Sequence, residues 1–292
     1  QLTKRLLAKP PNLFIGVDAP DFNLALEERL KAHGVKTVHF VCPSIWAWRA
    51  DRVEKIRHSV DHMLCIFPFE PALLASHGIA ATYVGHPLAS VIPMQADRAG
   101  ARARLGLREE DCVVAVLPGS RKSEVDYLAL RLFKAAALIK RKQAAIQFIV
   151  PAIPSLRQSI ERFADLAGMR ASLQIIEGQS HTALAACDVT LIASGTAYNM
   201  NWLSWQIMQR KQLQPWVGLP NILLKDFVVP EFLQHAATPE ALANAVLQWV
   251  DAKSTASGEI AALEARFTLL HFDLMRDTSL LATDAIQKIL ES

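Results

Sequence analysis

The stretch from Cys112 to Glu124 reads CVVAVLPGSRKSE and joins an apolar run, a tight loop and the expected start of a helix. N–H groups at a helix start lack intrahelical partners and lie at the positive end of the helix dipole, so such a loop suits an anion. Gly119 and Ser120 allow a ligand close to the backbone, and Arg121 adds donors suited to phosphate. Glycine and serine are also ordinary turn residues, so the loop alone fits a plain turn equally well.

A second loop, IASGTA over 192–197, again follows an apolar run. Ser194, Gly195 and Thr196 would present two hydroxyls and N–H groups at a helix start, which suits a diphosphate. Open parallel sheets bind ligands at the carboxyl ends of their strands, so two such loops favour function over a plain turn. Neither loop matches a Walker A or GxGxxG pattern, which disfavours nucleotide hydrolysis and dinucleotide binding. Further nucleotide-binding candidates are Glu177 and Gly178, which follow another expected strand.

The segment GVDAPDFN places Asp18 directly after the strand expected over Leu13 to Val17. One carboxylate at such a position fits a general base that deprotonates a hydroxyl. Aspartate also commonly caps helices, and a helix is expected to begin near Asn23. We therefore assign the capping duty to Asp21 and the chemical duty to Asp18.

Three aromatic or basic residues in CPSIWAWR, Trp46, Trp48 and Arg49, would form an amphipathic edge that covers a cleft or contacts an acyl chain or sugar. Core packing is the expected duty of at least one tryptophan. In VGHPL, His86 either bonds a phosphate or bonds a loop carbonyl. In GLPN, Asn221 either caps a helix or donates to a ligand, and the residues do not decide between these.

The chain holds 31 Lys and Arg against 28 Asp and Glu in 292 residues, a net charge of +3 that is too slight for a nucleic-acid binder. Four scattered cysteines indicate reduced core residues, and no residue group has metal-ligand or Ser-His-Asp spacing. No signal peptide or bilayer-spanning run is present, which predicts a cytosolic protein. Hydrophobic residues nevertheless reach 51% and the mean hydropathy is +0.19, which favours a lipid-contacting surface. Its best candidate is the aromatic and basic stretch over 202–213, with buried packing as the alternative.

Short apolar runs alternate with amphipathic segments, which predicts an α/β fold of parallel sheets covered by helices. A proline-rich change of character around 87–98 predicts a boundary between two domains, residues 1–95 and 96–267. Only about three strands precede the boundary, so we expect an N-terminal piece of that domain to be missing. After Gly218 the strand signal disappears. The strands are expected at Leu13–Val17, Thr37–Val41, His62–Ile66, Ala81–Val84, Val113–Leu117, Gln147–Val150, Leu173–Ile176 and Val189–Ala193.

The motifs GVDAPDFN, CPSIWAWR, VGHPL, LPGSR..E, ASGTA and GLPN, in this order, make the chain closely resemble the lipid A disaccharide synthase family over nearly all its length. The resemblance implies a GT-B glycosyltransferase with two Rossmann-like domains facing across a cleft, the first binding the acceptor and the second the nucleotide-sugar donor. It also implies that a C-terminal helix over 268–292 returns to the first domain. It implies transfer of 2,3-diacylglucosamine from its UDP donor to 2,3-diacylglucosamine 1-phosphate with release of UDP, without metal or cofactor. The resemblance further implies that the reaction takes place at the inner-membrane surface of a Gram-negative bacterium, and that the protein can form a homodimer.

Carried over by motif, Asp18 is the base that activates the acceptor hydroxyl for inverting attack. Arg121 stabilises phosphate, the residues 194–196 hold the UDP diphosphate, and Asn221 matches a functionally important asparagine. After Ala197 the family continues with a helix and strand that have no counterpart here, so about 12–15 residues are expected to be absent. The alternatives are another GT-B UDP-sugar enzyme, such as an epimerase or a peptidoglycan N-acetylglucosaminyltransferase, and a non-catalytic binding protein.

Overall fold

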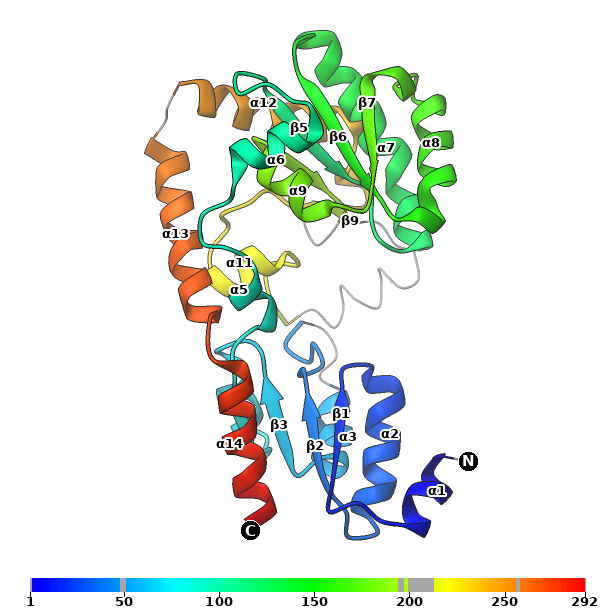
Figure 1. The fold of residues 1–292 in the computed structure, drawn as a ribbon, viewed down its shortest axis with the longest axis vertical. Coiled ribbons are helices and arrows are strands. Elements are labelled where there is room, and N and C mark those ends of the chain that lie inside the picture. The colour runs from blue at the N-terminus through cyan, green and yellow to red at the C-terminus, as the bar shows by residue number, and fades with distance from the viewer. Residues whose placement is uncertain (1, 48–50, 194–196, 199–212, 256–257, 292) are drawn as a thin grey trace. The chain divides into compact units, whose positions relative to one another are not determined.

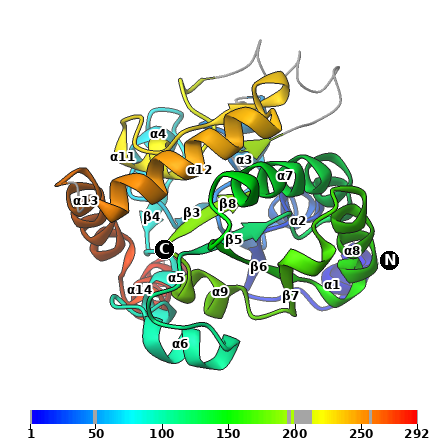
Figure 2. The same ribbon diagram turned by 90° about the horizontal axis from the view of Figure 1, so that it is seen from above.

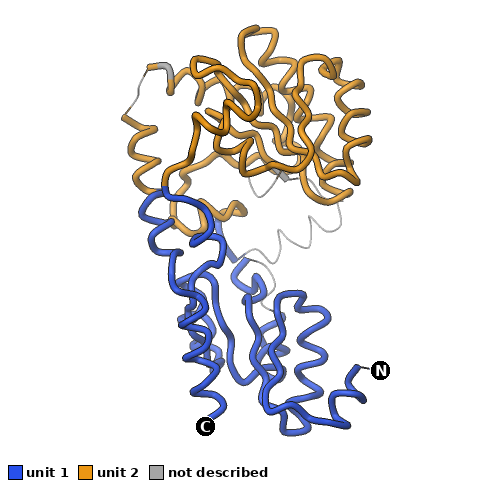
Figure 3. Tube along the Cα trace, in the orientation of Figure 1, with its two compact units in different colours: residues 1–94, 207–215, 267–292 blue, residues 95–206, 216–266 orange. Residues whose placement is uncertain are grey.

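The chain divides into two compact units, each built on a parallel sheet (Figure 3). The computed structural model describes residues 2–47, 51–193, 197–198, 213–255 and 258–291. Unit 1 comprises residues 1–94, 207–215 and 267–292, and unit 2 comprises residues 95–206 and 216–266. The C-terminal segment thus returns to the unit in which the chain begins.

Unit 1 holds a four-stranded parallel sheet in the order β1-β2-β3-β4, with helices on both faces (Figure 1). Its elements are α1 (Leu2–Ala8), β1 (Leu13–Val17), α2 (Pro20–Lys31), β2 (Lys36–Phe40), α3 (Arg52–Ser59), β3 (His62–Cys65), α4 (Glu70–Ala75), β4 (Ala81–Tyr83), α5 (Pro87–Val91), the end of α13 (Gly258–Leu274) and α14 (Thr278–Glu291).

Alternating residues of β2 serve the two faces of this sheet. Val38 packs with Leu64, Val84 and Ala285 of α14 in one buried cluster. Thr37 and His39 are fully buried on the other face. The hydroxyl of Thr37 donates to the carbonyl of Ser59 at the end of α3, and the ring of His39 hydrogen-bonds to Glu27 of α2. Because parallel strands run in one direction, the segments after β1, β2, β3 and β4 all lie at one edge of the sheet.

Unit 2 holds a second four-stranded parallel sheet, in the order β7-β6-β5-β8. Its elements are α6 (Arg98–Leu105), β5 (Val113–Leu117), α7 (Lys122–Lys142), β6 (Gln147–Ala152), η1 (Pro154–Leu156), α8 (Arg157–Leu166), η2 (Arg170–Ser172), β7 (Leu173–Glu177), α9 (Ser180–Ala186), β8 (Val189–Ile192), β9 (Ala197–Tyr198), α11 (Leu219–Leu224), β10 (Phe232–Leu233), η3 (Gln234–Ala236), α12 (Pro239–Ser254) and the start of α13.

Strand β5, which is buried from Val113 to Val116, separates two hydrophobic clusters, as the alternation of side chains along a strand requires. Val114 and Val116 face the cluster formed with α7, α8 and α12. Val113 and Ala115 face the smaller cluster formed with α6 and α9. Figure 2 shows the two groups of helices on opposite sides of this sheet.

The order of strands makes β5 the topological switch point of unit 2. The chain moves outward from β5 through β6 to β7, and then returns to place β8 on the other side of β5. Ligands of open α/β sheets bind outside the carboxyl ends of the strands at such a point. The loops after β5 and β8, which the sequence analysis selected, begin at this position.

The predicted strands agree with β1 to β8 to within two residues at each end. One expectation was wrong, because a strand does follow Gly218: β10 pairs in parallel with β9. Each of the two strands has only two residues, which is too short to give a periodic signal. Cys42 and Cys65 are buried free thiols, while Cys112 and Cys187 are half-buried.

Candidate active site

Asp18 lies exposed at the carboxyl end of β1, in a turn with unusual backbone angles. Asp18 and Ala19 both have positive φ, 50° and 42°, which non-glycine residues seldom adopt. The N–H of Asp18 donates to the carbonyl of Phe40 (2.9 Å), and the side-chain amide of Asn23 donates to the carbonyls of Val17 (3.1 Å) and Asp18 (2.8 Å). The turn is therefore held from both sides while the carboxylate of Asp18 stays open to solvent.

Asp21 does not cap the helix, contrary to expectation. Helix α2 begins at Pro20, three residues earlier than expected, and its N-cap position is Ala19, with no side-chain capping bond. Asp21 therefore lies in the first turn, where its carboxylate forms an ion pair with Arg52 of α3 (2.6 Å). Pro20 suits the first turn of α2, because the N–H that proline lacks would have no partner there. Pro20 was therefore the signal in the sequence for the true start of this helix.

Trp46 is a core residue, which confirms the expectation that at least one tryptophan packs inside. Its ring meets Phe67 and Phe69 edge-on, and its Nε1–H donates to Oε1 of Glu70 (3.1 Å). The other oxygen of this fully buried carboxylate accepts from the N–H of Phe67 (3.0 Å). Glu70 thus joins the loops after β2 and β3. Trp48 and Arg49 lie outside the described residues.

His86 has structural partners on both sides. Its backbone N–H donates to the carbonyl of Leu274 at the end of α13 (2.8 Å). Its ring Nδ1 accepts from the N–H of Leu88 (3.2 Å), so the side chain caps the short helix α5. Burial lowers the pKa of the imidazole below its usual value. These contacts favour the structural duty over phosphate binding.

The PGSR loop already holds an anionic group of its own. Glu124 accepts from the N–H groups of Ser120 (2.8 Å) and Arg121 (3.1 Å), and its other oxygen accepts from the guanidinium of Arg121 (2.9 Å). Gly119 has φ 120°, and a Cβ there would lie 2.4 Å from Cβ of Glu124. Gly119 therefore admits Glu124, where the sequence suggested a ligand. The remaining N–H groups of Arg121, on a side chain 79% exposed, are directed to no other described residue.

Two further candidates lie at the same edge of unit 2. Glu177 ends β7, and its carboxylate lies 3.8 Å from the guanidinium of Arg157. Gly178 has φ 62°, and its N–H donates to the carbonyl of Ala152 (2.8 Å), so it turns the chain at the strand end. The N–H of Ala193 donates to the carbonyl of Leu117 (2.8 Å), which sets the segment after β8 beside the PGSR loop. Ser194, Gly195 and Thr196 lie outside the described residues.

Asn221 is fully buried and does not cap α11, whose N-cap is Gly218. Its oxygen accepts from the N–H groups of Val228 (2.8 Å) and Val229 (2.9 Å), and its amide donates to the carbonyl of Val229 (2.9 Å) and to Glu231 (2.8 Å). Every hydrogen-bonding position of the side chain is filled, so Asn221 shapes its loop from within.

Glu231 completes that loop and was missed in the sequence. Its carboxylate accepts from the N–H groups of Val217 (3.0 Å) and Gly218 (2.8 Å) as well as from Asn221. The contact between Glu231 and Gly218 spans 13 residues, so no local pattern in the sequence predicts it. Glu124, by contrast, lies at the third position of α7, where a glutamate that bonds back to the N-cap is a recognised pattern.

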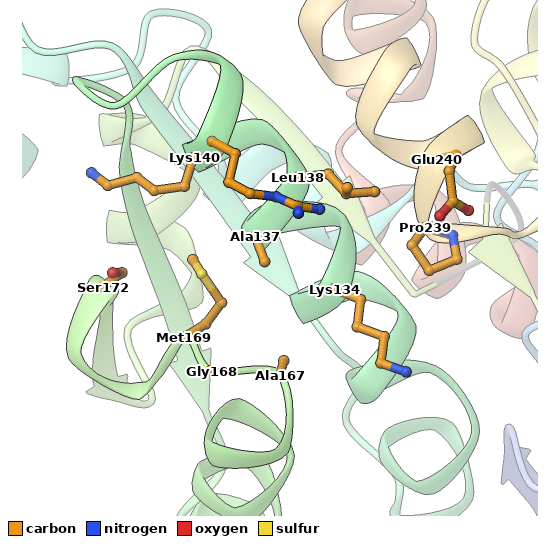
Figure 4. A pocket seen from close by; sticks show the side chains of 11 residues that line it. Lys134, Ala137, Leu138, Lys140, Ala167, Gly168, Met169, Ser172, Pro239 and Glu240 are labelled. Carbon is orange, nitrogen blue, oxygen red and sulfur yellow. The ribbon is translucent and has the colours of Figure 1, made fainter.

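A cavity of about 590 Å³ lies elsewhere in unit 2 (Figure 4). Its walls are the second half of α7, the segment over 167–172 and the first residues of α12, and it holds none of the predicted site residues. Within the described ranges, no three His, Cys, Asp or Glu side chains gather as metal ligands would. Across the same part of the chain, no helix is long and apolar enough to cross a membrane.

Solved structures of UDP-sugar enzymes share this fold. A co-structure of S. aureus MnaA with UDP matches with a TM-score of 0.65 at 11% identity, covering 100% of this chain and 78% of that one. A UDP-GlcNAc 2-epimerase from Neisseria meningitidis matches with a TM-score of 0.62 at 11% identity, covering 98% and 79%. The chain thus has the GT-B fold of these proteins, built here from two units with parallel sheets, as predicted.

The family is shown by sequence. The family model for lipid-A-disaccharide synthetase matches residues 1–284. The lipid-A-disaccharide synthase of Albidiferax ferrireducens is 68% identical over all of this chain and 78% of the relative, and that of Burkholderia thailandensis is 46% identical with the same coverage. The chain belongs to the lipid-A-disaccharide synthetase family, and it is a glycosyltransferase of lipid A biosynthesis. The epimerase alternative is disfavoured, because a likeness at 11% identity reports the fold alone.

Proposed function

We propose that the protein transfers 2,3-diacylglucosamine from its UDP donor to the 6-hydroxyl of 2,3-diacylglucosamine 1-phosphate and releases UDP. The carboxylate of Asp18 takes the proton of the hydroxyl, whose oxygen forms the new bond to C1 of the donor sugar. The bond from C1 to the diphosphate breaks on the opposite face, and its electron pair leaves with UDP, so the configuration at C1 inverts. Unit 1 binds the acceptor and unit 2 binds the donor.

Arg121 meets the charge that develops on the leaving diphosphate. Support comes from its exposed guanidinium at the start of α7, beside the switch point of unit 2, where the helix dipole also favours an anion. Residues 194–196, which follow β8 in the sequence, would hold the diphosphate with their hydroxyl and N–H groups. Asn221 acts indirectly in this proposal, by fixing the loop over 217–231. Trp46 and His86 likewise shape the edge of unit 1.

The observation that carries the assignment of Asp18 is its place: an exposed carboxylate in a restrained turn at the carboxyl end of a strand. Asp18→Asn is the sharpest test, because asparagine tolerates positive φ about as well as aspartate and keeps the turn. The variant is expected to lose on the order of 10²- to 10⁴-fold in kcat, as removal of a general base does. Release of UDP from the two acylated substrates measures turnover, and circular dichroism checks the fold. Undiminished turnover in a folded variant would rule out Asp18 as the base.

We further propose that the protein works at a membrane surface on its acylated substrates. Exposed apolar side chains in unit 1 support a lipid contact: Leu88 and Val91 on α5 and Phe272 on α13. The stretch over 202–213 that the sequence favoured lies outside the described residues, except for Leu213, which is 54% exposed. The expected homodimer and the expected absence of a helix and strand after Ala197 remain predictions.

A further inference from the structure

A buried pair of polar side chains lies beneath the turn that carries Asp18. Nδ1 of His39 on β2 lies 2.8 Å from Oε1 of Glu27 on α2, and both side chains are fully buried. A carboxylate only accepts hydrogen bonds, so the N–H of His39 donates to Glu27. Among the described residues given roles in the reaction above, none forms a hydrogen bond with this pair.

Burial of this pair has an unfavourable effect on the free energy of folding. Oε2 of Glu27 and Nε2 of His39 have no hydrogen-bond partner among the described residues, although both atoms are buried. Burying an unsatisfied polar atom disfavours folding, and apolar replacements of a buried polar pair are often neutral or stabilising. Stability therefore does not account for the pair, and unsatisfied buried groups of this kind concentrate at functional sites.

The position of the pair ties it to Asp18. His39 is the register partner of Gly16, which lies two residues before Asp18 on β1. Glu27 packs so closely on Gly16 that a Cβ there would lie 2.0 Å from its Oε1. One helical turn before Glu27, Asn23 bonds the carbonyls of Val17 and Asp18.

Three contacts therefore fix α2 against the ends of β1 and β2: Glu27 with His39, Glu27 with Gly16, and Asn23 with the turn. The turn itself needs such support, because consecutive positive φ values at Asp18 and Ala19 are unfavourable for non-glycine residues. We propose that Glu27, His39 and Asn23 are positioning residues that hold the strained turn and so direct the carboxylate of Asp18. The proposal rests on the proposed role of Asp18 as the base.

Amide hydrogen exchange tests the positioning without reference to turnover. Two hydrogen bonds report on the opposite ends of β2: Asp18 N–H to Phe40 O, and Asp61 N–H to Thr37 O, both 2.9 Å. The double replacement Glu27→Met with His39→Leu fills the site with apolar groups of similar volume. Exchange at Asp18 is expected to speed up at least tenfold, as a loosened turn opens more often, while exchange at Asp61 stays unchanged.

Thr37→Val is the matched control. Thr37 lies on the same face of β2 as His39, is equally buried, and donates to the carbonyl of Ser59 (2.9 Å) at the far end of the strand. It should speed exchange at Asp61 and leave Asp18 unchanged. Equal acceleration at both amides in the double variant, or none at Asp18, would overturn the proposal. If the double variant does not fold, Asn23→Ala provides the same test, with acceleration again expected at Asp18 alone.

Turnover gives the functional consequence. The double variant should lose on the order of 10- to 100-fold in kcat with KM little changed, because a misplaced catalytic group costs rate more than binding. Thr37→Val should keep its kcat, and a kcat equal to that of the control would contradict the positioning role. Asp18→Asn in parallel separates the two proposals: if that variant stays active the base assignment fails, whereas if it is inactive and the double variant is fully active only the positioning fails.

Discussion

Arg121 combines two interactions that its sequence position alone does not separate. One nitrogen of its guanidinium donates to Glu124 in the first turn of α7, which fixes one side of the guanidinium. The side chain of Arg121, at the N-cap of α7, is otherwise largely exposed to solvent. A guanidinium held at one side and open at the other is suited to bind a phosphate oxygen pair, since its N–H groups lie in one plane.

Replacement of Arg121 should therefore distinguish its charge from its geometry. Arg121→Lys keeps the charge but replaces the planar guanidinium by a single nitrogen, which cannot form a bidentate bond to phosphate, so we expect kcat/KM to fall on the order of tenfold or more. Arg121→Ala should cost on the order of 10²- to 10³-fold, as loss of a charge-stabilising donor does. Steady-state UDP release measures both. Lys122→Ala is the control, because this neighbouring cation pairs with Asp126 and should change the rate little; equal losses at both positions would argue against a specific role for Arg121.

The places of Asp18, Gly119 and Arg121 directly after strands were predictable from the local sequence, whereas their roles in the reaction remain predictions. Contacts between distant residues were not predictable: Glu231 reaches Val217 and Gly218 across the loop, and Glu70 reaches Trp46 across 24 residues. Such contacts depend on the tertiary fold, which brings distant segments together without any periodic pattern in the sequence. Asn221 is a further example. Its sequence context, GLPN, also fitted a ligand-binding loop, whereas in the fold its side chain is buried and fully hydrogen-bonded.

At the scale of elements, the carboxyl edge of the unit 1 sheet is built from loops that restrain each other. The loop after β2 is fixed to the loop after β3 through Glu70, and the turn after β1 is fixed to β2 through the N–H of Asp18. Val41, directly after β2, also has positive φ (79°), an outlier for a β-branched residue. The strain thus gathers at the edge where the proposed base lies, as is common at functional sites.

Glu70 should make the stability of unit 1 depend on pH. Burial raises the pKa of its carboxyl to about 7, although hydrogen bonds from Phe67 and Trp46 oppose the shift. A carboxyl whose pKa is raised by folding stabilises the fold below its unfolded pKa, and this contribution is lost as the pH rises through the folded pKa. With the pKa raised from an ordinary value of 4.5 to about 7, the loss of stability between pH 4 and pH 8 is about 3 kcal/mol.

Urea unfolding of the parent and of Glu70→Gln at several pH values measures this contribution. The parent should lose about 3 kcal/mol relative to the variant on going from pH 4 to pH 8, because glutamine does not titrate. Glu54→Gln on α3, an exposed partner of Arg57, is the control and should leave the pH profile of the parent in place. A constant difference between parent and Glu70→Gln across the range would show that Glu70 keeps an ordinary pKa.

At the scale of the whole molecule, the class of fold followed from the sequence because alternating strands and helices admit few arrangements. The positions of eight strands were predictable from apolar runs of four or five residues. Their parallel direction was predictable from the helices that alternate with them. The sheet order was not, since it depends on which strands pair, and β9 with β10 was too short to leave a pattern. The return of the C-terminal segment to unit 1 was predicted from the family resemblance, not from any local signal.

Unit 2 is closed by a charged cluster that joins its first and last complete helices. Asp188, at the start of β8, accepts from Arg98 and Arg102 of α6, from Lys253 of α12 and from the N–H of Val113. Burial opposes ionisation of this carboxyl, but the bonds from Lys253, Val113 and Arg98 outweigh it and lower its pKa. Arg102 is itself buried, and this carboxylate is the negative charge that compensates its guanidinium.

Asp188→Asn should therefore destabilise unit 2 by about 3 kcal/mol, the usual cost of leaving a buried charge without its partner. The urea midpoint at pH 7, followed by circular dichroism, measures the change. The lowered pKa predicts that the stabilising contribution in the parent is lost only as the pH falls below the ordinary range of an aspartate, so the two proteins should converge in acid. Glu110→Gln removes an exposed partner of Arg108 in the same unit and should cost less than about 1 kcal/mol. Equal effects of the two replacements would mean that the cluster does not close the unit.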